Sequence, residues 1–436
     1  MSVSAIKKIL PASLKKMVVK RFSFVFKQIS RLKTMCIRNA QHHLVNVLKD
    51  KKVINVVFLV IHDSIWKYEE LYRLLDRSKY FNVQIAVIPL VRDGVSQLDT
   101  YNQTLEYFKK GNYNTFGTYD ATSNVWLDVK SECNPDVVFF TNPHKLTFDK
   151  YYINNFTDKL TCYVPYAFVV IGEVRMHYGK DFHQYLWRYF LETETHNEYF
   201  KENAFLDNSN GRVTGYPGLD TKLNEDFQAK NVWKELNKLT KKIIWAPHHT
   251  IVGNGAGLDY SSFEEYHQFF IDLCKNNPFI QIAFKPHPLL REKLNSCERW
   301  GQEKTDNYFN AWNMLENGQF ENGPYIDLFE GSDAMIMDSA SFIAEYLYFD
   351  KPILFTLRDE DVQSRFNSFG QAIFKVLYQS RDTTQTNEFV KNQVSKEDDF
   401  LRVKRNNFLK TKILPANGKL ASENIFSELK LQLCQK

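Results

Sequence analysis

The sequence predicts two α/β domains built on parallel sheets, and three observations support this fold class. Apolar runs of strand length alternate with helix-like stretches from residue 53 onward. The alternation pauses at a charged helical stretch around residues 222–242 and then resumes. At 436 residues the chain is long for one domain, and its 44% hydrophobic content can fill two cores.

The expected strands can be placed in order along the chain. Those of the first domain are the apolar runs at residues 53–61, 83–90, 136–142, 160–171 and 211–217. Those of the second domain are the runs at residues 242–249, 279–288, 333–338 and 352–357. Residues 380–400, rich in Thr, Gln, Asn and charge, are read as a loop. The predicted parts of the chain are residues 1–52, 53–222, 223–400 and a helical segment at 401–436.

Positive charge is concentrated at one end of the chain. Residues 1–52 hold thirteen Lys and Arg and one acid, a net +12 within a total of +5, so the other 384 residues carry −7. A nucleic-acid-binding protein should carry its basic surface on the folded body, so this pattern argues against one. It favours an anionic surface that residues 1–50 meet, such as a membrane.

Within this basic segment the apolar residues recur every three or four positions. They are Leu14, Val18, Phe22, Val25, Ile29, Leu32 and Cys36. The pattern predicts a basic amphipathic helix that lies at a lipid boundary. The alternatives are a helix packed on the body of the protein and an organellar targeting peptide. With no run of eighteen apolar residues and no secretory signal, the expected location is the cytoplasmic face of the cell membrane.

Neither a metal nor a cofactor is expected. The six cysteines form no C-x-x-C pair, which argues against a disulfide framework and a zinc site. The adjacent His248 and His249 should point apart, and no Cys, Asp or Glu ligand is spaced with them. The D-x-D at residues 359–361 is read as a solvated helix start.

Polar residues follow the expected strands of the second domain, where open parallel sheets bind ligands. Asp338 ends one strand, and Ser339 and Ser341 follow it at the start of a helical pattern, which predicts an anion site at a helix N-terminus. The alternative is that Ser341 only caps this helix. In KPHP at 285–288, the prolines hold His287 at a rigid strand end beside Lys285. The alternative is that His287 only makes hydrogen bonds to local backbone carbonyls and has no role in binding.

Four segments in order carry a resemblance to a known family. They are GYPGLD at 215–220, IIWAPHHT at 243–250, KPHP at 285–288 and residues 327–355, where Asp327, Leu328, Ser332, Asp333, Asp338, Ser339, Ser341, Lys351 and Pro352 match. The chain resembles the CDP-glycerol glycerophosphotransferases of teichoic-acid and capsule synthesis. The resemblance implies a GT-B-like fold of two Rossmann-like domains facing across a cleft. The second domain would bind a nucleotide-activated, CDP-linked donor.

The resemblance also implies roles for particular residues. His287 would stabilise or protonate the departing pyrophosphate, and Glu345, one turn beyond Ser341, would bind the ribose. The expected donor-binding residues are Lys285, His248, His249, Asp338, Ser339, Ser341 and Glu345.

The acceptor side departs from the family, because its His-Gly catalytic-base motif is not found. Glu173 and His177 are the only nearby groups in the corresponding region that can take a proton from a hydroxyl. The choice between them stays open. His62 follows the first strand and could line the acceptor side, although Asp63 or Ser64 as a helix cap explains this turn more economically.

The expected function is transfer of glycerol phosphate, or a related alditol phosphate, from a CDP-linked donor to a hydroxyl of a surface polymer or lipid-linked acceptor. One alternative is a GT-B glycosyltransferase that uses a nucleotide sugar in capsule or lipopolysaccharide synthesis. Another is a non-catalytic scaffolding relative. A sugar-nucleotide epimerase of the same fold is less favoured, because it does not need a basic membrane-facing helix.

Overall fold

The computed structural model describes residues 12–92, 94–251, 260–340 and 342–434, which form two compact units. The first unit comprises Met1–Tyr166, Val174–Thr214 and Ser422–Lys436, and the second comprises Ala167–Glu173 and Gly215–Ala421. This division differs from the predicted boundary at 222 and from the predicted separate segment 401–436. The C-terminal helix α18 (Ala421–Leu433) belongs largely to the first unit, because its apolar side chains complete that unit's core: Ile425, Leu429 and Leu433.

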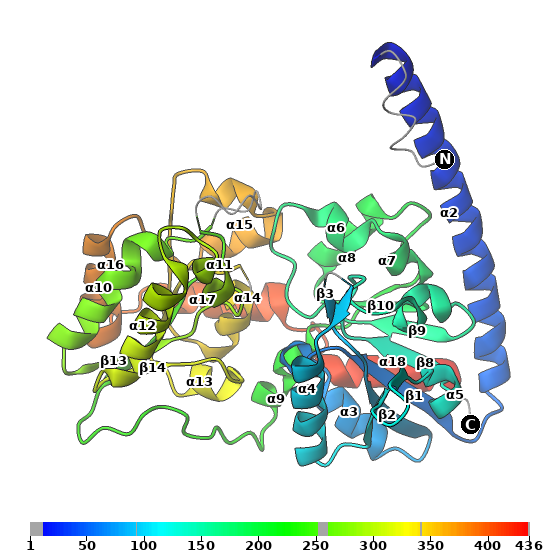
Figure 1. The fold of residues 1–436 in the computed structure, drawn as a ribbon, viewed down its shortest axis with the longest axis horizontal. Coiled ribbons are helices and arrows are strands. Elements are labelled where there is room, and N and C mark those ends of the chain that lie inside the picture. Colours follow the sequence, from blue (N-terminus) through cyan, green and yellow to red (C-terminus); the bar gives the residue numbers. More distant parts are fainter. Residues whose placement is uncertain (1–11, 93, 252–259, 341, 435–436) are drawn as a thin grey trace. The chain divides into compact units, whose positions relative to one another are not determined.

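The first unit is built on a parallel sheet, as the sequence predicted (Figure 1). The strands lie in the order β11-β10-β9-β8-β1-β2-β5. They are β1 (Ile54–Val60), β2 (Phe81–Val87), β5 (Thr115–Gly117), β8 (Val137–Phe140), β9 (Leu160–Tyr163), β10 (Arg188–Leu191) and β11 (Gly211–Val213). The chain runs from β1 outward to β5 and then returns to β8 on the other side of β1. This reversal between β1 and β8 is a topological switch point.

Helices pack around this sheet because its strands are apolar on both faces. Phe58 on β1 stacks on Phe139 of β8, with ring centroids 4.8 Å apart. The helices are α2 (Ala12–Leu48), α3 (Glu69–Asp76), α4 (Leu98–Lys110), α5 (Val129–Cys133), α6 (Val174–Tyr178), α7 (Asp181–Tyr185), α8 (Glu194–Asn203), and the short turns η1 (Asp63–Ile65), η2 (Asp149–Tyr151) and η3 (Ile153–Asn155). Two small hairpins are formed by β3 (Val91–Arg92) with β4 (Val95–Ser96) and by β6 (Tyr119–Asp120) with β7 (Val125–Trp126).

The second unit repeats the same plan with strand order β14-β13-β12-β15-β16-β17. The strands are β12 (Lys241–Ala246), β13 (Ile280–Phe284), β14 (Gly318–Phe320), β15 (Ala334–Met337), β16 (Ile353–Thr356) and β17 (Tyr378–Ser380), and all pair in parallel. This is the doubly wound 3-2-1-4-5-6 order, with its switch point between β12 and β15. Both units are therefore Rossmann-like, and the predicted fold class is confirmed.

Short helical elements connect the strands of the second unit. They are η4 (Pro217–Leu219), α9 (Asp220–Leu223), α10 (Phe263–Asn276), α11 (Leu290–Asn295), α12 (Gly301–Met314), α13 (Ile326–Glu330), α14 (Phe342–Glu345), η5 (Tyr346–Phe349), η6 (Val362–Arg365), α15 (Ser368–Phe374), α16 (Thr383–Phe389), η7 (Val390–Ser395), α17 (Arg402–Phe408) and η8 (Leu409–Ile413). Asp361 directly precedes η6, as expected of the D-x-D segment, and Asp359 pairs with Arg365 at 2.6 Å.

Two local predictions are wrong. Residues 224–240 contain no helix, because this linker is instead held by side chains such as Trp233, whose Nε1 donates to the Leu328 carbonyl at 3.2 Å. Residues 383–395 are helical rather than a loop. The many polar residues of this segment suggested a loop, but the side chains of Phe389, Val390 and Val394 pack in the core.

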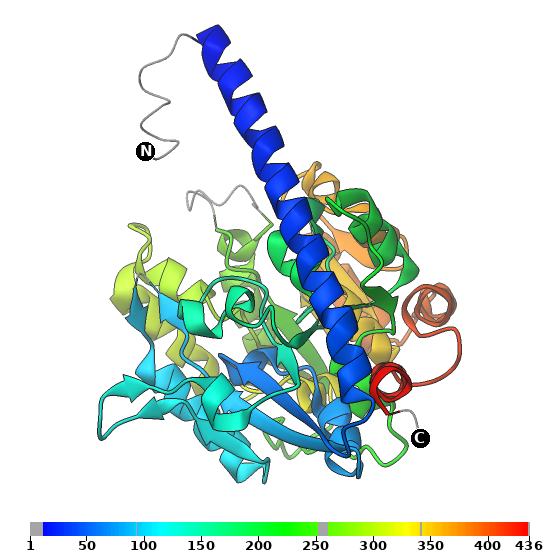
Figure 2. The ribbon, with the colours of Figure 1, turned by 90° about the vertical axis from the view of Figure 1, so that its right-hand side faces the viewer.

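The C-terminal half of α2 packs on the first unit through one face. Its buried residues recur at helical spacing and are Thr34, Ile37, Gln41, Val45 and Leu48. Figure 2 shows α2 as one continuous helix whose C-terminal end lies beside α18, and Leu48 shares a core cluster with Ile425 of that helix. No helix among the described residues is both long enough and apolar enough to cross a lipid bilayer.

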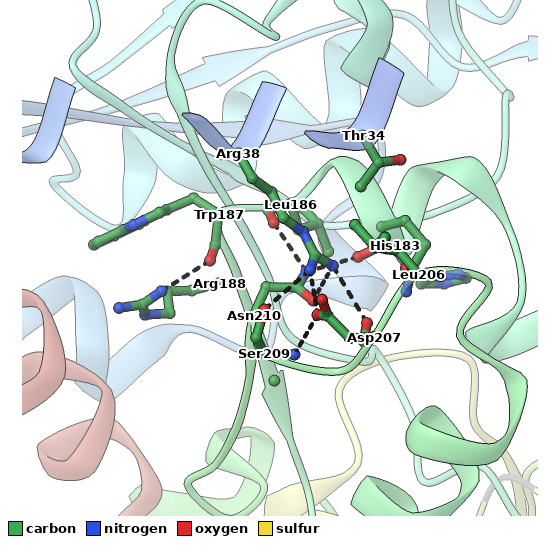
Figure 3. A network of polar contacts seen from close by, with 12 residues as sticks. Thr34, Arg38, His183, Leu186, Trp187, Arg188, Leu206, Asp207, Ser209 and Asn210 are labelled. Atoms are coloured by element: carbon green, nitrogen blue, oxygen red, sulfur yellow. Dashed lines mark hydrogen bonds and ion pairs between the residues drawn. The ribbon is translucent and has the colours of Figure 1, made fainter. Parts of the chain in front are cut away.

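A polar network fixes α2 to the loop that follows α8 (Figure 3). The Arg38 guanidinium donates to the Asp207 carboxylate and, at 2.9 Å, to the Asn210 side-chain oxygen. Asn210 Nδ2 in turn donates to the His183 and Leu186 carbonyls, both at 2.9 Å. The network thus connects α2 with the segment that contains α7.

Candidate functional site

The candidate site lies at the switch point of the second sheet. The strands β12 and β15 are neighbours, with Ala246 paired to Met337, so the residues that follow them emerge side by side. His248 and His249 follow β12, and Asp338 and Ser339 follow β15. At such a point the two neighbouring connections leave toward opposite faces of the sheet, which opens a ligand-binding position.

Asp338 organises this edge. Its carboxylate is buried and accepts from the His248 backbone N–H, from the Ser262 N–H at 2.6 Å and from the Ser262 hydroxyl at 2.9 Å. Burial raises the pKa of Asp338 to about 6, although these donors oppose the shift. The bonds hold the start of α10 and the turn after β12 against β15. Asp338 was predicted to bind the donor, and its described contacts support positioning of the residues around it.

Three imidazoles gather beside Asp338. The backbone N–H of His287 donates to the Pro247 carbonyl at 2.9 Å, which extends the contact between β12 and β13 beyond their ends. The His287 ring lies 5.1 Å from the His248 ring and 4.2 Å from the His249 ring, measured between centroids. One nitrogen from each ring lies within 4.8 Å of the others. The sequence predicted that KPHP (285–288) and APHHT (246–250) end neighbouring strands, and the sheet brings the two segments together at one edge.

The premise that His248 and His249 point apart is wrong. Their ring centroids are 4.3 Å apart. Side chains alternate between faces only while a strand continues, and β12 ends at Ala246, before either histidine. The turn, held by Asp338, therefore places both rings on the same side.

A hydrogen bond assigns the ring proton of His287. Its Nδ1 accepts the Leu289 backbone N–H at 3.1 Å, so the proton of the neutral ring resides on Nε2. His248 Nδ1 lies 2.9 Å from the Thr250 hydroxyl, which also accepts the Tyr260 N–H at 3.0 Å. A hydroxyl can donate to His248 Nδ1 or accept from it, so this contact is compatible with either tautomer of His248. His287 therefore presents its N–H donor at Nε2.

Burial keeps these rings neutral. Burial lowers the pKa of His287 to about 3, and the nearby His249 ring adds to this shift. Burial also lowers the pKa of His249 to about 4, and the charge of Lys293 adds to that shift. The pKa of His248 falls well below its ordinary value for the same main reason. Near neutral pH the cluster therefore offers uncharged hydrogen-bond donors.

Such a cluster suits the oxygens of an anion better than a metal ion. Three histidines are a ligand set that zinc uses, but each must supply a nitrogen lone pair. The proton on Nε2 of His287 occupies that position, and ligation through this nitrogen would require loss of the Leu289 bond. Phosphate oxygens accept this N–H group without that loss.

Lys285 lies next to the cluster. Its side chain is buried, its Nζ donates to the Gly323 carbonyl at 2.7 Å, and its backbone N–H donates to the Trp245 carbonyl at 2.8 Å. Burial lowers the pKa of Lys285 to about 8. The ammonium therefore stays mainly protonated at neutral pH, as the predicted fixed positive charge requires.

The helix after β15 is shorter than the sequence suggested. α14 has four residues and continues as the 3-10 turn η5, so its dipole contributes less than that of the predicted regular helix. Ser339 is buried at its start, and Ser341 lies outside the described residues. Glu345 is also buried, and its Oε1 accepts the Tyr216 hydroxyl at 2.5 Å. Ribose binding by Glu345 stays a prediction.

The predicted acceptor-side residues have different surroundings. His62 caps η1 with its own side chain, since Nδ1 accepts the Ser64 N–H at 3.1 Å, so neither Asp63 nor Ser64 is the cap. Glu173 is exposed and belongs to the second unit. His177, on α6 of the first unit, is half-buried, and burial lowers its pKa to about 4.

Sequence reasoning missed several residues of these sites. Ser262 contacts Asp338 across 76 positions of sequence and gave no sign of this beyond its place before α10. Tyr216, the partner of Glu345, lies in the GYPGLD segment, which was noted only for its resemblance. His144 lies two residues after the predicted strand 136–142, and the rule of strand ends could have singled it out.

Comparison with solved structures shows the class of fold. A UDP-N-acetylglucosamine 2-epimerase is 15% identical, with a TM-score of 0.57 over 87% of this chain and 96% of its own. The wall teichoic acid polymerase TagF is 13% identical, with a TM-score of 0.54 over 95% of this chain and 99% of its own. Together with the two Rossmann-like units, these likenesses define a GT-B-type fold.

Residues 175–429 match the family described as CDP-Glycerol:Poly(glycerophosphate) glycerophosphotransferase, and the chain belongs to this family. A curated relative is the teichoic acid ribitol-phosphate polymerase TarL of Staphylococcus aureus, which is 26% identical over 180 residues. The aligned stretch is 40% of this chain and 29% of TarL, so less than a third of that relative is represented.

Proposed function

We propose that this chain transfers an alditol phosphate, such as glycerol phosphate or ribitol phosphate, from a CDP-linked donor to a hydroxyl of a surface polymer or lipid-linked acceptor. The observation that carries the proposal is the cluster of His248, His249 and His287 at the switch point of the second sheet. Its neutral N–H donors suit the phosphates of a nucleotide donor. The family to which the chain belongs supports the choice of a CDP-alditol.

The reaction places definite demands on these residues. The acceptor oxygen bonds to the phosphorus that bears the alditol, the bond from that phosphorus to the CMP phosphate oxygen breaks, and the hydroxyl proton passes to a base. Charge develops on the departing CMP. The Nε2–H of His287 and the Lys285 ammonium would stabilise that charge, and Ser339, Ser341 and Glu345 would hold the rest of the donor.

A nucleotide-sugar glycosyltransferase is the second candidate. Two observations support this candidate. The His-Gly motif of the glycerophosphotransferases is not found, and the same fold occurs in a protein named for a nucleotide sugar, the UDP-N-acetylglucosamine 2-epimerase. A panel of labelled CDP-glycerol, CDP-ribitol, UDP-sugars and CMP-sugars with bacterial membranes as acceptor separates the two. Turnover confined to the CDP-alditols supports the proposal, and turnover confined to the sugars overturns it. Donor binding with no turnover on any acceptor would identify a non-catalytic relative.

We further propose that α2 attaches the enzyme to the cytoplasmic face of an anionic membrane. The described end of the predicted apolar stripe, Ile29, Leu32 and Cys36, is exposed, with Ile29 55% and Leu32 63% accessible. The buried face of the helix uses other residues, from Thr34 to Leu48. Packing on the body therefore leaves the stripe uncovered, and both can occur in one helix.

Removal of residues 1–27 is expected to reduce sedimentation with anionic liposomes at least about tenfold, since each Lys or Arg near such a surface contributes about 1 kcal/mol. Removal of residues 1–50 would also delete Val45 and Leu48 from the core, so the shorter truncation is the sharper test. The control is the exposed pair Lys109 and Lys110 on α4 changed to Gln. Unchanged sedimentation of the truncated protein would contradict the proposal.

A further inference from the structure

A second group of polar side chains lies at the carboxyl edge of the first sheet. The strands β1 and β8 are neighbours at this sheet's own switch point. Residues 141–144 follow β8, and a turn in which the His144 N–H donates to the Asn142 side-chain oxygen at 2.6 Å fixes the position of His144. This is the position at which an α/β unit of this topology binds its ligand.

Two further histidines, His177 and His183, lie on the helices that follow β9. The His177 ring on α6 lies 6.4 Å from the His144 ring, at 80° between planes, and the Tyr166 ring lies 6.3 Å from His144. His183 on α7 is fully buried and stacks on Tyr189 at 5.2 Å. Neither nitrogen of the His183 ring has a hydrogen-bond partner among the described residues. His144 and His177 are half-buried, whereas His183 is fully buried.

The local charge of this group is positive. Lys180 directly precedes α7, lies three residues from both His177 and His183, and accepts the His183 backbone N–H on its carbonyl at 3.1 Å. Besides burial, its charge lowers the pKa of His144, His177 and His183. No carboxylate is among the groups that shift these three pKa values. The imidazoles therefore stay neutral near pH 7 and can accept a proton. The cation beside them suits an anionic ligand.

We propose that His144, His177 and Lys180 form the acceptor subsite: His144 takes the proton of the acceptor hydroxyl, His177 positions His144, and Lys180 pairs with a phosphate next to that hydroxyl. This inference rests on the proposed function and names its acceptor as the hydroxyl end of a phosphodiester polymer. The proton moves from the hydroxyl to a ring nitrogen of His144 as the oxygen bonds to phosphorus. Water then receives the proton from the imidazolium.

The attachment of α2 supports this placement. Gln41 Nε2 on α2 donates to the Tyr185 carbonyl of α7 at 2.8 Å, and the network of Arg38 and Asn210 reaches the His183 carbonyl (Figure 3). The helix proposed to contact the membrane is therefore bonded directly to the segment that carries the acceptor subsite. A polymer held at the membrane surface would meet this segment first.

The test compares His144→Gln, His177→Gln and Lys180→Gln with wild type, using labelled CDP-glycerol as donor and either a glycerol-phosphate oligomer or free glycerol as acceptor. His144→Gln should lower kcat for transfer about 10²–10⁴-fold with unchanged donor affinity, and should remove the acidic limb of the pH profile of kcat. Lys180→Gln should raise KM for the oligomer and leave KM for glycerol unchanged. His43→Gln, exposed on α2, is the matched control.

The outcomes separate the inference from the proposed function. If the wild type transfers alditol phosphate and His144→Gln has the same kcat, the inference is overturned but the proposed function is not. Absence of turnover of any CDP-alditol by the wild type would overturn the proposed function and the inference with it. Thermal unfolding of each variant, together with a His144→Asn variant, shows whether a loss of kcat reflects a loss of folded protein.

Discussion

His287→Ala is expected to lower kcat for alditol-phosphate transfer roughly 10²–10³-fold, the cost of removing one well-placed donor to a developing negative charge. The reason is the fixed N–H at Nε2, which the Leu289 amide holds in place by occupying Nδ1. The measurement is a steady-state rate with labelled CDP-glycerol. The control is His267→Ala, a half-buried histidine on α10. Equal rates for His287→Ala and wild type would remove the donor assignment.

The same variant has a thermodynamic signature that does not depend on activity. The folded-state pKa of His287, about 3, lies below its ordinary value of 6.5, so the folded protein binds fewer protons than the unfolded chain between these pH values. The contribution of His287 is present above pH 6.5 and is lost as the pH falls toward 3. The free energy of unfolding of wild type should therefore fall more steeply on acidification than that of His287→Ala.

Asp338→Asn is expected to disorder the donor edge. Asp338 accepts from His248 on one oxygen and from Ser262 on the other, whereas Asn has one oxygen and an NH₂ group that would face one of these N–H donors. We expect the free energy of unfolding to fall by about 1–3 kcal/mol and kcat to fall at least about tenfold. Urea unfolding and hydrogen exchange of the His248 and Ser262 amides measure this. Asp361→Asn, exposed before η6, is the control.

The pH dependence gives Asp338 a sign opposite to that of His287. Its folded-state pKa, about 6, is raised above the ordinary 3.8, so its contribution is present at low pH and is lost as the pH rises through about 6. As the pH rises from 4 to 6, the free energy of unfolding of wild type should therefore fall relative to that of Asp338→Asn. A variant as stable and as active as wild type throughout would contradict the positioning role.

Strand ends were the most predictable part of this molecule. The runs at 242–249, 279–288 and 333–338 each contain a strand of the second sheet, and the residues after them meet at one edge. The reason is physical, because parallel strands buried on both faces leave a continuous apolar signal and end together at a polar edge. Short edge strands such as β14 and β17 carry a weaker signal and were not predicted.

Contacts between residues far apart in the sequence could not be predicted in the same way. The packing of α18 on the first unit joins residues 421–433 to strands that begin at residue 54, and local patterns do not encode such distant pairing. The alignment of the His248 and His249 rings depends on where β12 ends and on the bond to Asp338. The sequence marks His144 only as a residue near a strand end, whereas its neighbour His177, whose ring lies 6.4 Å away on α6, is seen only in the structure.

The chemistry of transfer can be tested with CDP-glycerol labelled on the phosphorus next to glycerol. Alditol-phosphate transfer breaks the bond between the two phosphates, so we expect CMP to be released in equal amount to the label that enters the acceptor, with both lost in His287→Ala. Glycosyl transfer from a UDP-sugar would instead release UDP. Release of UDP from a UDP-sugar, with no label transferred from CDP-glycerol, would contradict the proposed function.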